Sequence, residues 1–244
     1  MPTVDTEPVT ISKSSNSLAI TGLVAGILLL PLGLFGPDLI GGLFYLAIDG
    51  HYDFAFRKHS GIAVLMVFLT ILVLRGAVLW FHARWARPRG VFRVEFRWDK
   101  ASTVWTGVAF LLAAGLIYLD RIVAPNPNHI PLLRAFSSYW GIGYGLTNTI
   151  LQFVYYFSEG LAMIWMADAF QTAGEAKVRV WIPWGGIALA LLWGGGHLFS
   201  KDLTTALALL LPGFVIGALY SLSGKRLWPA QLLFFVLTLP ELFK

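Results

Sequence analysis

A glutamate and a histidine are the residues whose chemistry stands out in this sequence. Glu159 lies inside a long apolar stretch, and His197 follows Trp193 and three consecutive glycines. An ionisable side chain inside a membrane segment is costly, so Glu159 is a candidate for function. Together, a glutamate and a histidine can bind a water molecule and deprotonate it. Residue type alone leaves a second interpretation open, in which both side chains only form hydrogen bonds to neighbouring helices.

Glu159 is also the last member of a polar stripe. Asn148, Gln152, Tyr155 and Glu159 are spaced by four, three and four residues, which places them on one face of a helix. Lipid cannot satisfy polar groups, so the stripe is expected to face other helices or a wet cavity. Its members are therefore candidates for binding a substrate or partner. Asp168 falls on the opposite side of the same helix and is expected near the membrane interface.

The sequence gives little support for a metal or cofactor site. It contains no cysteine, which excludes thiolate ligands and disulfides. Glu159 and His197 supply only two ligands, whereas a catalytic zinc usually takes three from the protein. His51 and His59 lie in another loop and lack a recognisable ligand spacing. We therefore predict no metal and no cofactor.

Composition identifies the class of protein that must position these residues. The chain has 244 residues, of which 57% are hydrophobic and 13% charged, and a mean hydropathy of +0.71. Soluble domains carry about 25% charged residues. The sequence therefore predicts an all-α, multi-pass protein that is integral to a lipid bilayer. Its net charge of +5 comes from loops beside apolar spans, which indicates membrane orientation rather than binding to nucleic acid.

The apolar pattern predicts about seven spans. They cover residues 18–35, 61–81, 103–123, 138–171, 180–199, 203–222 and 227–243. The apolar piece 39–48 is too short to cross and is expected to lie at the interface or to dip into it. The fourth stretch would make a helix of about 50 Å, longer than the hydrocarbon core of about 30 Å. It is either one strongly tilted helix or two segments broken at 158–160.

The segments between the spans are polar. Residues 1–17 are expected to form a short mobile tail, and residues 51–59 a polar loop. Residues 82–102 form the most basic loop, which is expected to be solvated at the lipid surface. The alternation within 82–100 is also compatible with a short hairpin or an amphipathic interfacial stretch. Three prolines then favour a non-helical connection at residues 125–131.

Charge distribution predicts the orientation of the chain. The basic loop 82–100, the N-terminal tail, and the loops at 177–179 and 223–226 are expected to share the cytoplasmic side. One arginine, Arg75, lies within the second span. It is expected either to snorkel to the nearer end of that span or to pair with Asp120.

The C-terminal part of the sequence resembles the CPBP family, which comprises the CAAX prenyl proteases and the bacteriocin-processing (Abi) intramembrane proteases. Four features carry the resemblance: Trp193 four residues before His197, the run GFVIGALY at 213–220, Ser223-Gly224, and the sequence LWPA at 227–230. The similarity covers about residues 150–240. It implies a transmembrane helical core and an origin in the cytoplasmic membrane of a prokaryote, with a cytoplasmic N-terminus.

The resemblance also implies functions for individual positions. The family pattern has two adjacent glutamates and an arginine four residues beyond the second; here these positions hold Ser158-Glu159 and Met163. A later histidine and asparagine correspond to Phe234 and Thr238. In the family, the glutamates and the first histidine would activate water, while the last pair would polarise the scissile carbonyl. Trp193, Phe234 and Thr238 are thereby further candidates for contacting a substrate or partner.

These observations predict three parts and two possible functions. The parts are a polar tail at 1–17, N-terminal transmembrane helices at 18–137 and a CPBP-like core at 138–244. Because Phe234 and Thr238 lack the family's chemistry, we expect a non-catalytic or weakly active relative that binds another membrane protein as a scaffold, assembly factor or immunity protein. The alternative is an intramembrane endopeptidase that cleaves a membrane-associated or prenylated peptide, with Glu159 and His197 activating water.

Overall fold

The computed structural model describes residues 13–51, 59–123, 132–178, 182–199 and 203–239. Four of the helices described are long and apolar enough to cross a membrane: Ser15–Asp49, Gly61–Arg89, Lys100–Leu119 and Phe136–Glu175. Three shorter apolar helices follow at Trp184–Gly194, Leu207–Leu222 and Leu227–Thr238. The prediction of an all-helical protein built for a membrane is confirmed at this level. Each expected span corresponds to one of these helices.

The first helix is longer than the sequence suggested. Helix α1 (Lys13–Leu29), the π-helical turn η1 (Leu30–Phe35) and α2 (Gly36–Asp49) run on without interruption. Residues 39–48 are therefore not a separate segment but the end of this helix. Their expected position, at the membrane interface or dipping into it, stays a prediction. Residues 13–17, expected in the tail, are already helical, whereas residues 1–12 lie outside the described part. Glycine is needed at Gly36, because a Cβ there would lie 2.3 Å from the carbonyl oxygen of Pro31.

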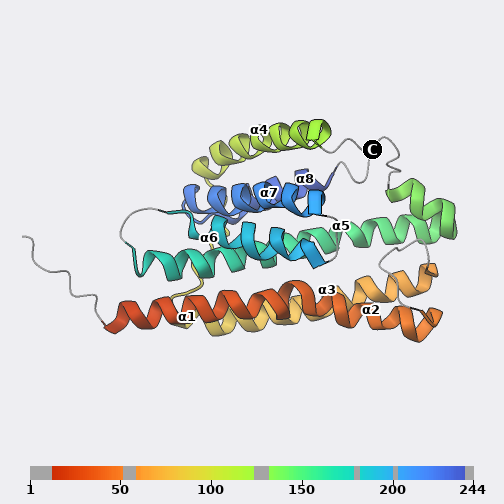
Figure 1. The fold of residues 1–244 in the computed structure, drawn as a ribbon, viewed down its shortest axis with the longest axis horizontal. Helices are drawn as coiled ribbons and strands as arrows, with labels where there is room; N and C mark the ends of the chain where they lie inside the picture. Colours follow the sequence, from red (N-terminus) through yellow and green to blue (C-terminus); the bar gives the residue numbers. More distant parts are fainter. Residues whose placement is uncertain (1–12, 52–58, 124–131, 179–181, 200–202, 240–244) are drawn as a thin grey trace, which may run out of the picture.

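Helix α5 (Leu132–Glu175) is the centre of the bundle. It packs against α1 and α3 (Gly61–Ala86) on one side and against the later helices on the other (Figure 1). Of the two alternatives for this stretch, the break at 158–160 is wrong, because the helix runs through these residues as a single element. The chain instead departs from helical geometry at Gly141, whose φ of 79° is readily adopted only by glycine.

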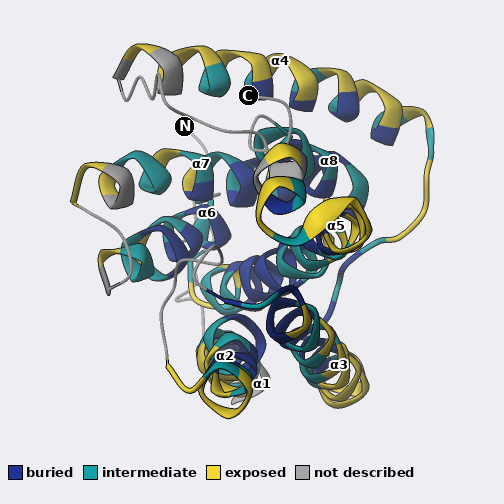
Figure 2. Ribbon diagram, turned by 90° about the vertical axis from the view of Figure 1, so that its right-hand side faces the viewer, coloured by how far each residue is buried: buried dark blue, intermediate teal, exposed yellow. Residues whose placement is uncertain are grey.

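The later helices form the opposite layer. They are α6 (Trp184–Ala188), the π-helical turn η4 (Leu189–Gly194), the short turn η5 (His197–Phe199), α7 (Leu203–Leu222) and α8 (Leu227–Thr238). Helix α4 (Lys100–Val123) covers α8, and the outer face of α4 is exposed (Figure 2). An apolar outer face of this kind is compatible with lipid contact.

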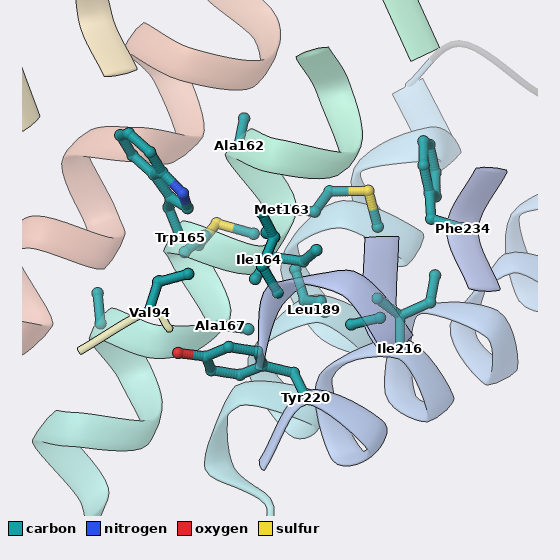
Figure 3. Packing of buried hydrophobic residues seen from close by; sticks show 14 of the residues in the cluster. Val94, Ala162, Met163, Ile164, Trp165, Ala167, Leu189, Ile216, Tyr220 and Phe234 are labelled. Atoms are coloured by element: carbon teal, nitrogen blue, oxygen red, sulfur yellow. The ribbon is translucent and has the colours of Figure 1, made fainter. Parts of the chain in front are cut away.

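The main hydrophobic core surrounds the second half of α5. Met163, Ile164 and Met166 are fully buried, and so are the alanines between residues 162 and 169. Leu189 from η4, and Ile216 and Phe234 from α7 and α8, pack onto them (Figure 3). A helix that is apolar all round must be enclosed on every side, which explains the central position of α5.

The basic segment 82–102 is not the solvated loop that we expected. Helix α3 continues to Ala86, a 3₁₀ turn η3 covers Arg87–Arg89, and the extended stretch that follows buries Val91, Phe92 and Val94 in the core. Its backbone is fixed at Glu95, whose amide donates to the carbonyl of Lys225 and whose carbonyl accepts from Leu227. The alternation of apolar residues therefore reflects insertion between helices.

Two acids hold this segment in place. Asp168 is fully buried and accepts a hydrogen bond of 2.6 Å from the amide of Arg93; its place near the membrane interface stays a prediction. Asp99 forms an ion pair of 2.9 Å with Arg226. The hydrogen bond from this guanidinium holds the pKa of Asp99 well below its usual range. The contacts also bring 82–100 and 223–226 to one end of the bundle, as predicted; the compartment that they face stays a prediction.

Some expectations fall on residues outside the described part. They concern most of the loop at 51–59, the proline connection at 125–131, and the first residues of the fifth span and the last residues of the seventh.

A pair of glycine substitutions tests the packing of α6 on α7. A Cβ at Gly217 would lie 2.6 Å from the backbone of Gly186, whereas a Cβ at Gly107, on the exposed face of α4, would meet nothing within 4 Å. We expect Gly217→Ala to lower the free energy of unfolding by about 1–3 kcal/mol. Gly107→Ala is expected to raise it by about 0.4–1 kcal/mol. Thermal unfolding of both variants in detergent measures whether each substitution lowers or raises stability. A Gly217→Ala variant as stable as the wild type would contradict the close packing.

Candidate functional site

The most unusual group inside the bundle is the guanidinium of Arg75. Its side chain is completely buried and forms an ion pair of 3.1 Å with Asp38, whose side chain is 34% exposed. It donates further hydrogen bonds to the carbonyls of Gly33 and Leu34, at 2.9 and 3.2 Å, and to the Ser158 hydroxyl at 3.1 Å. Our expectation that Arg75 snorkels to the end of its span is therefore wrong. The alternative partner, the Asp120 side chain, lies outside the described part.

The π-helical turn η1 makes this arrangement possible. Pro37 has no N–H, so the carbonyl of Gly33, four residues earlier, has no helical donor. Gly36 donates instead to Pro31, five residues back. The free carbonyl of Gly33 accepts from Arg75, which replaces the missing backbone donor. Such replacement is required where no water is available, because an unsatisfied carbonyl in the hydrocarbon region is costly.

The polar stripe on α5 adds Tyr155 and Glu159 to Arg75 and Asp38, and we call these four residues the polar centre. The ring of Tyr155 lies 4.7 Å from the Arg75 guanidinium, a cation–π distance. Glu159, one turn further along, interacts electrostatically with Arg75 and with Asp38. Earlier in the stripe, Asn148 and Gln152 are buried, and Asn148 donates to the Gly61 carbonyl of α3. The prediction that this stripe faces other helices is confirmed.

Trp193 connects Glu159 to His197. The indole N–H donates to the Glu159 carboxylate at 3.0 Å, and the imidazole Nδ1 of His197 lies 2.8 Å from the Trp193 carbonyl oxygen. The rings of Trp193 and His197 are 4.9 Å apart at an interplanar angle of 75°. Glu159 and His197 are both half-buried, and the same tryptophan positions them both. The structure thus brings the two residues together through an intervening side chain.

Two of the three glycines before His197 allow neighbouring elements to approach closely. Gly194 is the last residue of the turn η4, and Gly196 directly precedes His197. A Cβ at Gly194 would lie 2.9 Å from the Leu209 carbonyl oxygen of α7, and one at Gly196 would lie 2.6 Å from the ring of Phe35. The end of η1 and the segment that carries His197 therefore lie side by side.

The α8 side of the centre is apolar. The Phe234 ring lies 6.1 Å from that of Trp193 and also faces Gly160, where a Cβ would be only 2.7 Å away. Gln231, one turn earlier, donates to the Phe157 carbonyl at 3.1 Å. Thr238 does not join this group; it donates within its own helix to Phe235. Of the two α8 positions selected from the sequence, the structure places one at the centre.

Sequence reasoning missed Arg75 and Asp38 as members of the site. The signal was present in the spacing of the two prolines, Pro31 and Pro37, because they leave helix carbonyls without donors in a segment that must be helical in lipid. A buried arginine is one of the few groups that can satisfy several carbonyls together. Arg75 was assigned to a span end because the apolar run was taken to stop at Phe81, whereas the helix continues beyond it.

Within the described residues, no group of three or more histidine, aspartate or glutamate side chains is arranged to hold a metal ion. At the far end of the bundle, His59 contacts Asp49 at 3.0 Å. The His59 ring also stacks on Tyr45, with 3.7 Å between centroids. These contacts are those of a packed helix junction.

The fold and this polar centre define a multi-helical membrane protein with buried charges at a junction of several helices. No protein-family model, curated protein or solved structure matches the chain. What the centre does is therefore inferred from its residues.

Substituting Arg75 tests whether the polar centre fixes the bundle. Arg75→Met leaves Asp38 and the Gly33 carbonyl without this partner, so we expect the free energy of unfolding to fall by about 3–5 kcal/mol. Removing the acid as well, in Asp38→Asn with Arg75→Met, is expected to recover part of this loss. Arg97→Met, at a guanidinium side chain that is 64% exposed, is the control and should change stability by less than about 1 kcal/mol. Equal melting temperatures for Arg75→Met and Arg97→Met would refute the assignment.

Proposed function

We propose that this chain acts by binding another membrane protein or a membrane-associated peptide, as a non-catalytic or weakly active relative of the CPBP type. Its role would be that of a scaffold, an assembly factor or an immunity protein. We further propose that it crosses the membrane about seven times, with the three shorter apolar helices completing the four long ones. Lipid is its other permanent partner.

The observation that carries this proposal is the packing of Phe234. At the position where the resemblance implies a histidine, an apolar ring lies against Trp193 and Gly160. Phenylalanine can neither donate a hydrogen bond to an oxyanion nor exchange a proton. Met163, where the resemblance implies an arginine, is also fully buried in the core. The features that hold α5 against α8 are present, while the groups that would stabilise a developing negative charge there are replaced.

The resemblance to the CPBP family itself gains support from the arrangement of three segments. The family pattern is spread over the glutamate helix, the aromatic–histidine segment and the last helix. In this chain Glu159, Trp193 with His197, and Phe234 come from α5, from η4 with η5, and from α8. They meet at one place in the bundle. This convergence is what a CPBP-like core requires.

A specific observation also favours the second candidate, an intramembrane endopeptidase. Glu159 and His197 contact the same tryptophan and are only half-buried, so a water molecule between them is compatible with their exposure. In that function Glu159 would serve as the base. The substrate would be a membrane-associated or prenylated peptide.

A conservative double substitution separates the two functions. Glu159→Gln keeps an oxygen that can accept from Trp193 but removes the basic carboxylate, and His197→Asn removes the imidazole. We expect the Glu159→Gln, His197→Asn double variant to behave in cells like the wild type and to co-purify with the same partners in mild detergent. Phe234→Ala, which leaves a cavity against Trp193, is expected to lose the partner or the fold. If the double variant folds and keeps its partner, but has the phenotype of a deletion, then catalysis matters and the scaffold proposal fails.

Cysteine labelling tests the proposed orientation in the cytoplasmic membrane of a prokaryote. Because the chain has no cysteine, single substitutions such as Arg97→Cys and Leu222→Cys can be probed one at a time. In intact cells we expect both to be protected from an impermeant thiol reagent, because basic segments stay in the cytoplasm. His51→Cys, at the opposite end, is expected to react. The reverse pattern would place the N-terminus outside.

A further inference from the structure

The end of α3 carries a group of arginines that lie on aromatic rings. The Arg84 guanidinium carbon lies 5.7 Å from the Trp80 ring centroid, that of Arg89 lies 4.7 Å from Trp85, and that of Arg87 lies 5.4 Å from Phe92. We call Trp80, Arg84, Trp85, Arg87 and Arg89 the arginine–aromatic surface. All five residues are exposed. Arg89 also donates one hydrogen bond to the Trp85 carbonyl oxygen at 2.7 Å. A guanidinium has five N–H groups, so further donors are left for an anion.

The acids at this end of the bundle do not neutralise the surface. Glu95 pairs with Arg97, and Asp99 with Arg226 and Arg97. Glu175 pairs with Arg93 and Lys225. In the described part of the chain, Arg84, Arg87 and Arg89 have no carboxylate partner. Local charge is therefore positive, and the complementary ligand is an anion.

A hollow lies beside Arg89. It has a volume of about 610 Å³ and is lined by Ser15, Ser17, Leu18, Thr21, Arg89 and Ala176, from the start of α1, the end of η3 and the residue that follows α5. Lys177 lies at the same place and hydrogen-bonds Asn16. The hydroxyls of Ser15 and Thr21 donate to the carbonyls of Ala176 and Ser17, so the Arg89 guanidinium and the Lys177 ammonium are the charged donors for a phosphate here. The leucine and alanine in the lining give the hollow an apolar wall.

The position of this surface along the helices indicates that the phosphate belongs to a lipid headgroup. The helix with the first apolar span begins at Ser15, and the helix with the second ends at Arg89. The hollow therefore lies at one end of both helices, where we expect lipid headgroups. Trp80 and Phe81, about two turns further in, are 57% and 64% exposed and would face acyl chains. A single lipid would contact both regions, with its phosphate at the arginines and its acyl chains along Trp80 and Phe81 of α3.

We propose that the arginine–aromatic surface and the adjoining hollow form a binding site for the headgroup of an anionic phospholipid, with Arg89 as its main phosphate ligand. The site is distinct from the polar centre, and it requires neither the scaffold nor the protease function.

The full chain in a neutral detergent is titrated with phosphatidylglycerol, and in parallel with phosphatidylcholine, while native mass spectrometry records the first bound lipid. We expect phosphatidylglycerol to bind preferentially. Each arginine near the headgroups is expected to contribute about a fivefold change in affinity, so Arg89→Gln should weaken binding about fivefold, and Arg87→Gln with Arg89→Gln about 25-fold. Arg89→Lys should retain part of the affinity because it keeps the charge but not the fork geometry.

The matched control is Arg97→Gln, which removes the same charge from the same end of the bundle. It should leave the affinity for phosphatidylglycerol unchanged, and all variants should keep the melting temperature of the lipid-free wild type. Equal weakening by Arg89→Gln and Arg97→Gln would mean diffuse attraction only and would overturn the site. Displacement of the lipid by millimolar glycerol 3-phosphate would also overturn the proposal, because the ligand would then be a soluble phosphate compound.

Discussion

The burial of one guanidinium constrains the arrangement of three transmembrane segments. Arg75 cannot leave water without finding acceptors, and a continuous α-helix offers none from its backbone. The π-helical turn η1 supplies carbonyls from the first helix, α5 supplies Ser158 and the Tyr155 ring, and Asp38 supplies the countercharge. Because these acceptors come from fixed positions on two other helices, they define the register of α3 between them. A shift of one turn along any of the three would leave the charge unpaired in lipid.

The two π-helical turns meet at the same level of the bundle. The end of η1 contacts the glycine that precedes His197, and η4 places Trp193 against Glu159. Such turns are rare in helices and often mark functional positions. Here η1 provides carbonyl acceptors for Arg75, and η4 places the indole N–H of Trp193 within hydrogen-bond distance of the Glu159 carboxylate. The polar centre is therefore enclosed by the two places where the helices depart from regularity, with α5 between them.

Hydropathy and helical spacing predicted the number and type of helices and the inward orientation of the stripe from Asn148 to Glu159. These features depend on local composition, which a single sequence contains. Other features depend on what lies opposite. The break at Gly141, the insertion of Val91 and Val94 and the burial of Arg75 all require knowledge of the facing surface. Glu159 was selected because a charge in lipid is conspicuous, whereas Asp38 falls between the apolar segments 18–35 and 39–48 and does not interrupt either of them.

The distribution of charge around Glu159 bears on the choice between binding and catalysis. The resemblance implies cationic and proton-exchanging groups at positions 163 and 234, on the α5 and α8 side. In this chain methionine and phenylalanine occupy those positions, and the cation is Arg75, on the α3 side of α5. The Glu159 carboxylate instead accepts a hydrogen bond from the Trp193 indole, while the charge of Arg75 is balanced by Asp38 in an ion pair of 3.1 Å. A half-buried glutamate held in this way contributes to the contact between α5 and η4 without any chemistry. Its presence alone is therefore no argument for hydrolysis.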